Sequence, residues 1–114
     1  MKVYIDDVRD PKLFLTPELS DGIIWMKEWW EAKNFVLKNA GEIEVIHFDH
    51  FMPPARKTGS DIFHMVVSKA RRGKFPKLKQ IYVHSSDLGV ISGLMQNEDK
   101  LADIGIELIN NRNR

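Results

Sequence analysis

The 114-residue chain contains no cysteine, which excludes a disulfide framework and thiol chemistry. No stretch approaches the roughly 18 consecutive apolar residues that a membrane-spanning helix needs. The first apolar run is interrupted by two aspartates, a pattern that a secretory signal peptide does not show. We therefore expect a cytoplasmic protein that makes no use of a membrane and folds without cross-links.

The sequence also lacks a strong excess of charge. Its 17 basic and 16 acidic residues give a net charge of +1, too little for a strong field toward nucleic acid or an anionic membrane. The length, the hydrophobic share of 43% and the charged share of 29% fit one globular domain over residues 1–114. Basic residues do cluster between Lys69 and Lys79. This cluster is either a solvated helix end, which complements the helix dipole, or a patch that steers a phosphate-bearing ligand.

Short β-favouring runs alternate with longer amphipathic segments along the chain. We expect strands at residues 3–5, 23–26, 44–48, 80–83 and 104–109. We expect helices at 28–39, from an N-cap at Ser60 to about residue 70, and at 88–102. Residues 8–22 hold two prolines and little helical periodicity, so the first crossover helix should be short or missing. The pattern predicts an α/β fold with a doubly wound, flavodoxin-like parallel sheet of about five strands.

Polar residues follow four of the five predicted strands. Ligands of an open parallel sheet bind outside the carboxyl ends of its strands, so these positions form the candidate site. They are Asp6, Asp7 and Arg9 after the first strand, Asp49 and His50 after the third, His84, Ser85 and Ser86 after the fourth, and Asn110 and Asn111 after the last. We expect them to converge on one edge of the sheet.

Three of these residues are carboxylates, namely Asp6, Asp7 and Asp49. Carboxylates brought together repel one another unless a cation lies among them, and oxygen ligands suit Mg²⁺. Nearby histidines would also permit Mn²⁺. The alternative for Asp6 and Asp7 is a plain strand-end turn, where aspartate is common.

His50 and His84 are expected to be catalytic together with Asp49. Imidazole titrates near neutral pH, so one histidine can deprotonate water while the other protonates a leaving oxygen in phosphodiester hydrolysis. Arg9 would grip the phosphate with its planar guanidinium, and Ser85 would donate a hydrogen bond to it. The remaining histidines have no predicted role: His47 should face the core and His64 should lie on a helix surface.

Four short segments, in order along the chain, resemble the cyclic-phosphate processing receiver-like family, which comprises short phage and bacterial relatives of response-regulator receiver domains. The segments are YIDDVR at 4–9, FDH at 48–50, TGSD at 58–61 and VHS at 83–85. The resemblance implies that Asp6 and Asp7 match the acidic metal-binding pair. It also places Asp49 at the phosphoacceptor position and Ser85 at the hydroxyl position of the fourth strand.

Two departures from these patterns bear on function. The lysine that receivers carry after the last strand is replaced by Asn110 and Asn111, which disfavours phosphorelay signalling. The family pattern Asp-His-Asp-Leu-Gly reads DHFMP at residues 49–53, so Phe51 replaces an acidic residue and would weaken metal binding or catalysis. The histidines and Arg9, by contrast, are additions that a plain receiver does not need.

The leading hypothesis is a metal-dependent phosphoesterase that acts on a cyclic nucleotide or on a cyclic-phosphate end of nucleic acid. A first alternative is a non-catalytic module that binds a protein partner through the tryptophan-rich helix and apolar residues such as Phe51 and Met52. A second alternative is a receiver that accepts a phosphoryl group on Asp49.

Overall fold

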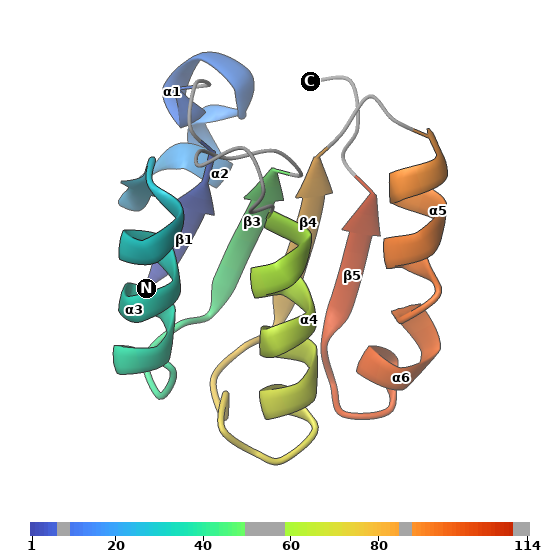
Figure 1. The fold of residues 1–114 in the computed structure, drawn as a ribbon. Coiled ribbons are helices and arrows are strands. Elements are labelled where there is room, and N and C mark those ends of the chain that lie inside the picture. Colours follow the sequence, from blue (N-terminus) through green and yellow to red (C-terminus); the bar gives the residue numbers. More distant parts are fainter. Residues whose placement is uncertain (7–9, 50–58, 85–87, 111–114) are drawn as a thin grey trace.

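Five short strands form one parallel sheet with the order β2-β1-β3-β4-β5 (Figure 1). The computed structural model describes residues 1–6, 10–49, 59–84 and 88–110. The strands are β1 (Lys2–Ile5), β2 (Ile23–Met26), β3 (Val45–Asp49), β4 (Gln80–His84) and β5 (Glu107–Asn110). This strand order is the flavodoxin-like one, in which the chain reverses its direction of winding after β2. The predicted α/β class and five-stranded parallel sheet are confirmed.

Six helices lie in the described part of the chain, between the strands. They are α1 (Pro11–Phe14), α2 (Pro17–Ser20), α3 (Trp29–Lys38), α4 (Gly59–Ala70), α5 (Leu88–Met95) and α6 (Glu98–Ala102). Over its described residues, 10–22, the first crossover contains only the four-residue helices α1 and α2, as the prolines predicted. Each of these has proline in its first turn, where the missing N–H costs nothing, and an Asp or Thr side chain caps it. No helix in the described ranges is long and apolar enough to cross a membrane.

The predicted helix at 88–102 is wrong as a single element, because the chain interrupts it between α5 and α6. Both the backbone N–H and the side-chain amide of Asn97 donate to the carbonyl of Leu94, at 3.2 and 3.0 Å, and close a turn there. After α6, Gly105 has a φ of 81°. The bonds Ile106 N–H to Leu101 O and Gly105 N–H to Ala102 O complete a Schellman motif. The last strand therefore begins at Glu107 and not at residue 104.

The predicted start of the second long helix, α4, is also wrong. It begins at Gly59, so Ser60 lies in its first turn and is not the N-cap that the sequence suggested. Ile62, Phe63 and Val66 are buried along α4, which explains why this helix packs firmly although its predicted start was displaced by two residues.

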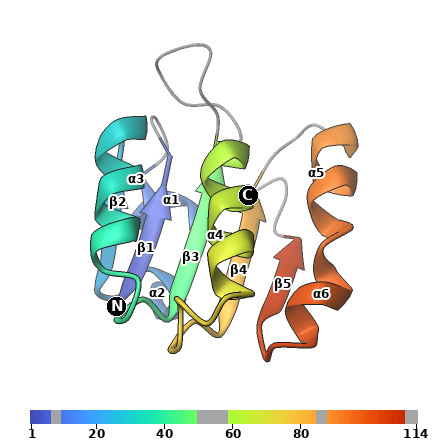
Figure 2. The ribbon, with the colours of Figure 1, turned by 60° about the horizontal axis from the view of Figure 1, so that its bottom comes forward.

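One face of the sheet, here called the core face, is apolar and covered by helices. Strand side chains alternate between faces, and the registers align Val3, Ile46, Ile81 and Leu108 across four strands. Helices α3, α4, α5 and α6 lie side by side on this face (Figures 1 and 2). Their buried side chains join the strand residues in one hydrophobic cluster, so this face holds the main core.

The opposite face, here called the histidine face, carries a different layer. The same registers align Tyr4, His47 and Tyr82, and all three side chains are buried. The Lys2 ammonium donates to the carbonyls of Glu18 and Asp21 at 3.1 Å, which places α2 beside this face at β1. Right-handed crossovers explain the arrangement, because β1 to β2 runs in the opposite direction across the sheet from the later crossovers.

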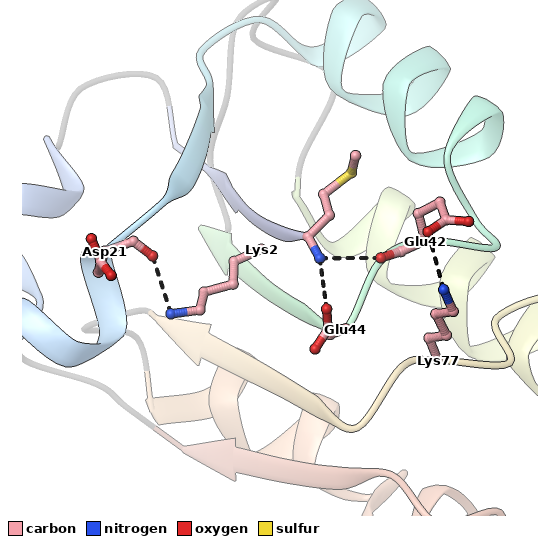
Figure 3. A network of polar contacts seen from close by, with 6 residues as sticks. Lys2, Asp21, Glu42, Glu44 and Lys77 are labelled. Carbon is pink, nitrogen blue, oxygen red and sulfur yellow. Dashed lines mark hydrogen bonds and ion pairs between the residues drawn. The ribbon is translucent and has the colours of Figure 1, made fainter.

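The amino-terminal edge of the sheet is held by exposed polar contacts (Figure 3). The amino group of Met1 lies 2.9 Å from the Glu44 carboxylate, and the Lys77 ammonium lies 3.1 Å from that of Glu42. The hydrogen bond and charge of the Met1 ammonium lower the pKa of Glu44. Such surface pairs stabilise a fold only slightly.

Candidate active site

Three of the predicted site positions lie next to one another at the carboxyl edge of the sheet. Ile5 of β1 pairs with Phe48 of β3. Asp6 and Asp49 are the next residues after this pair, so they lie at neighbouring strand ends. Asp49 in turn pairs with His84 of β4. Residues that are 43 and 35 positions apart in the sequence are thus brought to three adjacent strand ends. The sequence analysis placed Asp49 and His84 just after their strands. The structure shows instead that each is the last residue of its strand.

The other predicted site residues cannot be placed in the same way. Asp7, Arg9, His50 and Ser85 lie outside the described residues, and so does Phe51. Their predicted roles, and the roles of Asp6, Asp49 and His84, stay predictions. Asn110 is the last residue of β5, the strand next to β4, and it is an exposed residue.

Asp6 is buried where β1 ends, with a relative exposure of 1%. Its backbone is fixed from β2, since its N–H donates to Met26 O at 3.1 Å and its carbonyl accepts from Trp25 Nε1 at 2.8 Å. The Tyr4 hydroxyl donates to Oδ2 of Asp6 at 3.4 Å. A buried carboxylate is costly unless it is hydrogen-bonded, paired or bound to a metal. A rigidly held carboxylate at this edge fits the oxygen ligands that Mg²⁺ or Mn²⁺ requires.

A metal centre cannot be built from the described side chains alone. Within residues 1–6, 10–49, 59–84 and 88–110 no group of three or more acidic, histidine or cysteine side chains is arranged to hold a metal ion. Asp7, a predicted ligand, lies outside these ranges. The metal is therefore part of the proposal below.

Two histidines of neighbouring strands, His47 of β3 and His84 of β4, contact each other near the carboxyl edge of the sheet. Nδ1 of His47 and Nε2 of His84 are 2.9 Å apart, and both rings are buried. The His47 ring stacks on Tyr82 with centroids 4.3 Å apart and an angle of 9° between the rings. Tyr4 contacts both histidine rings, with centroid distances of 5.6 and 5.7 Å. His84, the histidine of the candidate site, thus packs against a layer of aromatic rings formed by Tyr4, His47 and Tyr82.

Burial decides the charge of His47. Loss of hydration, with smaller contributions from the charges of His84 and Lys2, lowers the pKa of His47 from 6.5 to about 3. His47 is therefore a neutral imidazole near neutral pH. Its Nε2 atom is buried and has no hydrogen-bond partner among the described residues.

The sequence prediction that His47 faces inward is confirmed, since its ring is fully buried, but that prediction gave it no role. The hydrogen bond to His84 could not be read from the sequence without the register of β3 and β4. One signal was present: His84 lies two residues beyond Tyr82, the register partner of His47, so both histidines are on one face and diagonal to each other. His64 is exposed on α4, as predicted.

The basic cluster lies away from the site. The segment from Arg71 to Lys79 connects the end of α4 to the start of β4, so it runs along the amino-terminal edge of the sheet. Its basic side chains are exposed, and Lys77 pairs with Glu42. This position favours the interpretation as a solvated helix end over that of a patch beside the site.

A groove of about 430 Å³ opens between α3 and α4. Apolar side chains of Trp29, Leu37, Ile62 and Met65 line it, together with Lys33 at its rim. The groove contains none of the predicted site residues, because its lining comes from the two helices and not from the strand ends. It adds nothing to the candidate active site.

The strand order and the acidic and histidine positions at the carboxyl edge define a receiver-like α/β domain. The model of the family described as "Cyclic-phosphate processing Receiver domain" matches residues 1–96, and the chain belongs to this family. No curated protein and no solved structure was found to match the chain.

Proposed function

We propose that this domain is a metal-dependent phosphoesterase that opens cyclic phosphates, either in a cyclic nucleotide or at a cyclic-phosphate end of nucleic acid. The observation that carries the proposal is the placement of Asp6, Asp49 and His84 on three adjacent strand ends. Membership of a family described as processing cyclic phosphates supports the choice of substrate. The position of these three residues agrees with the rule that open parallel sheets bind ligands at their carboxyl edge.

The reaction is hydrolysis of one ester bond. The oxygen of a water molecule attacks phosphorus, the ring P–O bond breaks, and the product is a phosphomonoester with a free hydroxyl. A base takes one proton from the water, and the departing oxygen receives one proton. In this proposal, His50 and His84 are the two groups that move these protons.

The remaining residues hold the substrate and the metal. Asp6, Asp7 and Asp49 would bind Mg²⁺ or Mn²⁺, which supplies a Lewis acid and neutralises charge on the phosphate. Arg9 would bind two phosphate oxygens, and Ser85 would donate a hydrogen bond to the phosphate.

The test is turnover of a substrate panel in the presence of Mg²⁺ or Mn²⁺. The panel comprises cyclic mononucleotides, cyclic dinucleotides and RNA with a cyclic-phosphate end. Asp49→Asn and His84→Ala should each lower the rate by about 10²-fold or more, because each removes a reacting or metal-binding group. His64→Ala is the matched control, since His64 is an exposed histidine away from the strand ends.

Two results would contradict the proposal. One is the absence of turnover for every substrate with either metal. The other is full activity of Asp49→Asn and His84→Ala. Transfer of one phosphoryl group from a small phosphodonor to Asp49, without hydrolysis of the panel, would support the phosphoacceptor alternative instead.

A further inference from the structure

Among the described residues, the contact between His47 and His84 is a buried polar interaction that the proposed chemistry leaves unused. The two rings come from neighbouring strands on the histidine face, and their centroids are 5.1 Å apart. The contact joins Nδ1 of His47 to Nε2 of His84 at 2.9 Å. An imidazole has only two nitrogens, so a hydrogen bond at Nε2 makes Nδ1 the nitrogen of His84 on which a proton exchange would take place.

We propose that His47 is a positioning residue that accepts a hydrogen bond from Nε2–H of His84 and thereby commits Nδ1 of His84 to proton transfer at the carboxyl edge. The proposal rests on the proposed function for its catalytic consequence, but the hydrogen bond itself can be tested without turnover. It assigns a role to a residue that is neither a metal ligand nor in contact with the phosphate.

The direction of the hydrogen bond follows from what His84 must do. If His47 donated from Nδ1, neutral His84 would carry its own proton on Nδ1 and could not accept one there. When His84 became protonated, its Nε2–H would face the Nδ1–H of His47, and two donors cannot form a hydrogen bond. If His47 accepts, the bond persists in both protonation states of His84. A neutral His47 then carries its ring proton on Nε2.

The surroundings of His47 keep this acceptor in place. Its ring has no solvent exposure, lies flat against Tyr82 and contacts Tyr4. Rotation of such a ring would disturb close packing on both sides. The same Tyr4 reaches Asp6 through its hydroxyl, so one aromatic layer orients a carboxylate and a histidine of the site together. Partners of this kind fix the tautomer and the orientation of a functional imidazole.

The first experiment is nitrogen NMR of the histidine rings in the full chain near neutral pH. The expected result is an unprotonated Nδ1 and a protonated Nε2 on His47, with a protonated Nε2 on His84. His47→Phe, which keeps an aromatic ring against Tyr82 but removes the acceptor, should shift the nitrogen signals of His84. A protonated Nδ1 on His47, or His84 signals that do not change in His47→Phe, would overturn the proposal.

The second experiment compares the kinetics of two variants. His47→Phe should lower kcat by about 10-fold or more, the size of effect seen when an orienting partner is lost, with KM unchanged. His47→Asn should recover part of the rate, because its side-chain oxygen can stand near the position of Nδ1. If His47→Phe and the wild-type protein have equal kcat, His47 is not a positioning residue for His84.

The two proposals can fail separately. If the wild-type protein turns over no cyclic phosphate while the ring signals are as expected, the proposed function fails and the hydrogen-bond assignment stands. If turnover is normal and Nδ1 of His47 is the protonated nitrogen, the assignment fails and the function stands.

Discussion

The two faces of this sheet are built from alternate residues of the same strands, yet they differ in chemistry. The core face presents aliphatic and phenylalanine side chains to α3, α4, α5 and α6. The histidine face presents Tyr4, His47, Tyr82 and His84, and the described helices on its side are short. Neighbouring residues of one strand therefore lie in different surroundings, as Val83 in the hydrophobic core and His84 among aromatic rings illustrate. The core face stabilises the fold, and we propose that the histidine face orients the residues at the carboxyl edge.

The largest expected effect comes from breaking the core face. Phe63 of α4 is fully buried and meets Phe48 of β3 edge to face, with ring centroids 5.6 Å apart. Phe63→Ala should lower the free energy of unfolding by about 3 to 5 kcal/mol, because it leaves a cavity in a closely packed region. Urea denaturation measures this loss. A loss below about 1 kcal/mol would show that the core face does not dominate stability.

Acid should destabilise the protein through the histidine face. The pKa of His47 is about 3 in the folded chain against 6.5 as its ordinary value, so between these values the unfolded chain binds a proton that the folded chain does not. The contribution of His47 is therefore complete above about pH 6.5 and is lost progressively as the pH falls toward 3. Urea denaturation across this pH range should show a steeper decline for the wild-type protein than for His47→Phe. Parallel curves would contradict this account.

Removal of His84 should have a smaller effect on stability. His84→Ala leaves Nδ1 of His47 buried without its partner, which costs about 1 to 3 kcal/mol. In the double variant with His47→Phe the cost of removing His84 should shrink, because no acceptor remains to be satisfied. Thermodynamic cycles from urea denaturation of the two single variants and the double variant measure the coupling. Strictly additive losses would show that the two rings do not interact.

The smallest effect is expected at the amino-terminal edge, away from both faces. Lys77 and Glu42 form an exposed ion pair at 3.1 Å. Lys77→Ala should change the free energy of unfolding by less than about 1 kcal/mol, since water and salt screen such pairs. A larger loss on thermal or urea denaturation would mean that this edge contributes more to stability than its exposure suggests.

Much of the fold could be predicted because its signals are local. β-branched runs marked the strands, and Pro11 and Pro17 correctly indicated that the first crossover lacks a long helix. The break at Asn97 was missed because apolar residues continue at helical spacing on both sides of it, while the interruption depends on hydrogen bonds to Leu94. The late start of β5 depends on the left-handed conformation of Gly105, which the apolar pattern does not show.

The site was predictable to a different extent. The adjacency of the ends of β1, β3 and β4 follows from the parallel order, so Asp6, Asp49 and His84 could be grouped from the sequence. The bond between His47 and His84 could not, since it depends on strand register and on the rotamers of two buried rings. A histidine inside a strand looks like a core residue until its neighbour across the sheet is known.

The most direct test of the contrast between the faces uses the adjacent residues Val83 and His84, both buried in β4. The measurement is kcat for hydrolysis of a cyclic phosphate, with Mg²⁺ or Mn²⁺, by folded Val83→Ala and folded His84→Ala. Val83→Ala should be less stable yet keep the wild-type kcat, while His84→Ala should lose about 10²-fold or more in kcat. A wild-type rate in His84→Ala, or an equal loss of rate in both variants, would contradict the assignment of the histidine face to function.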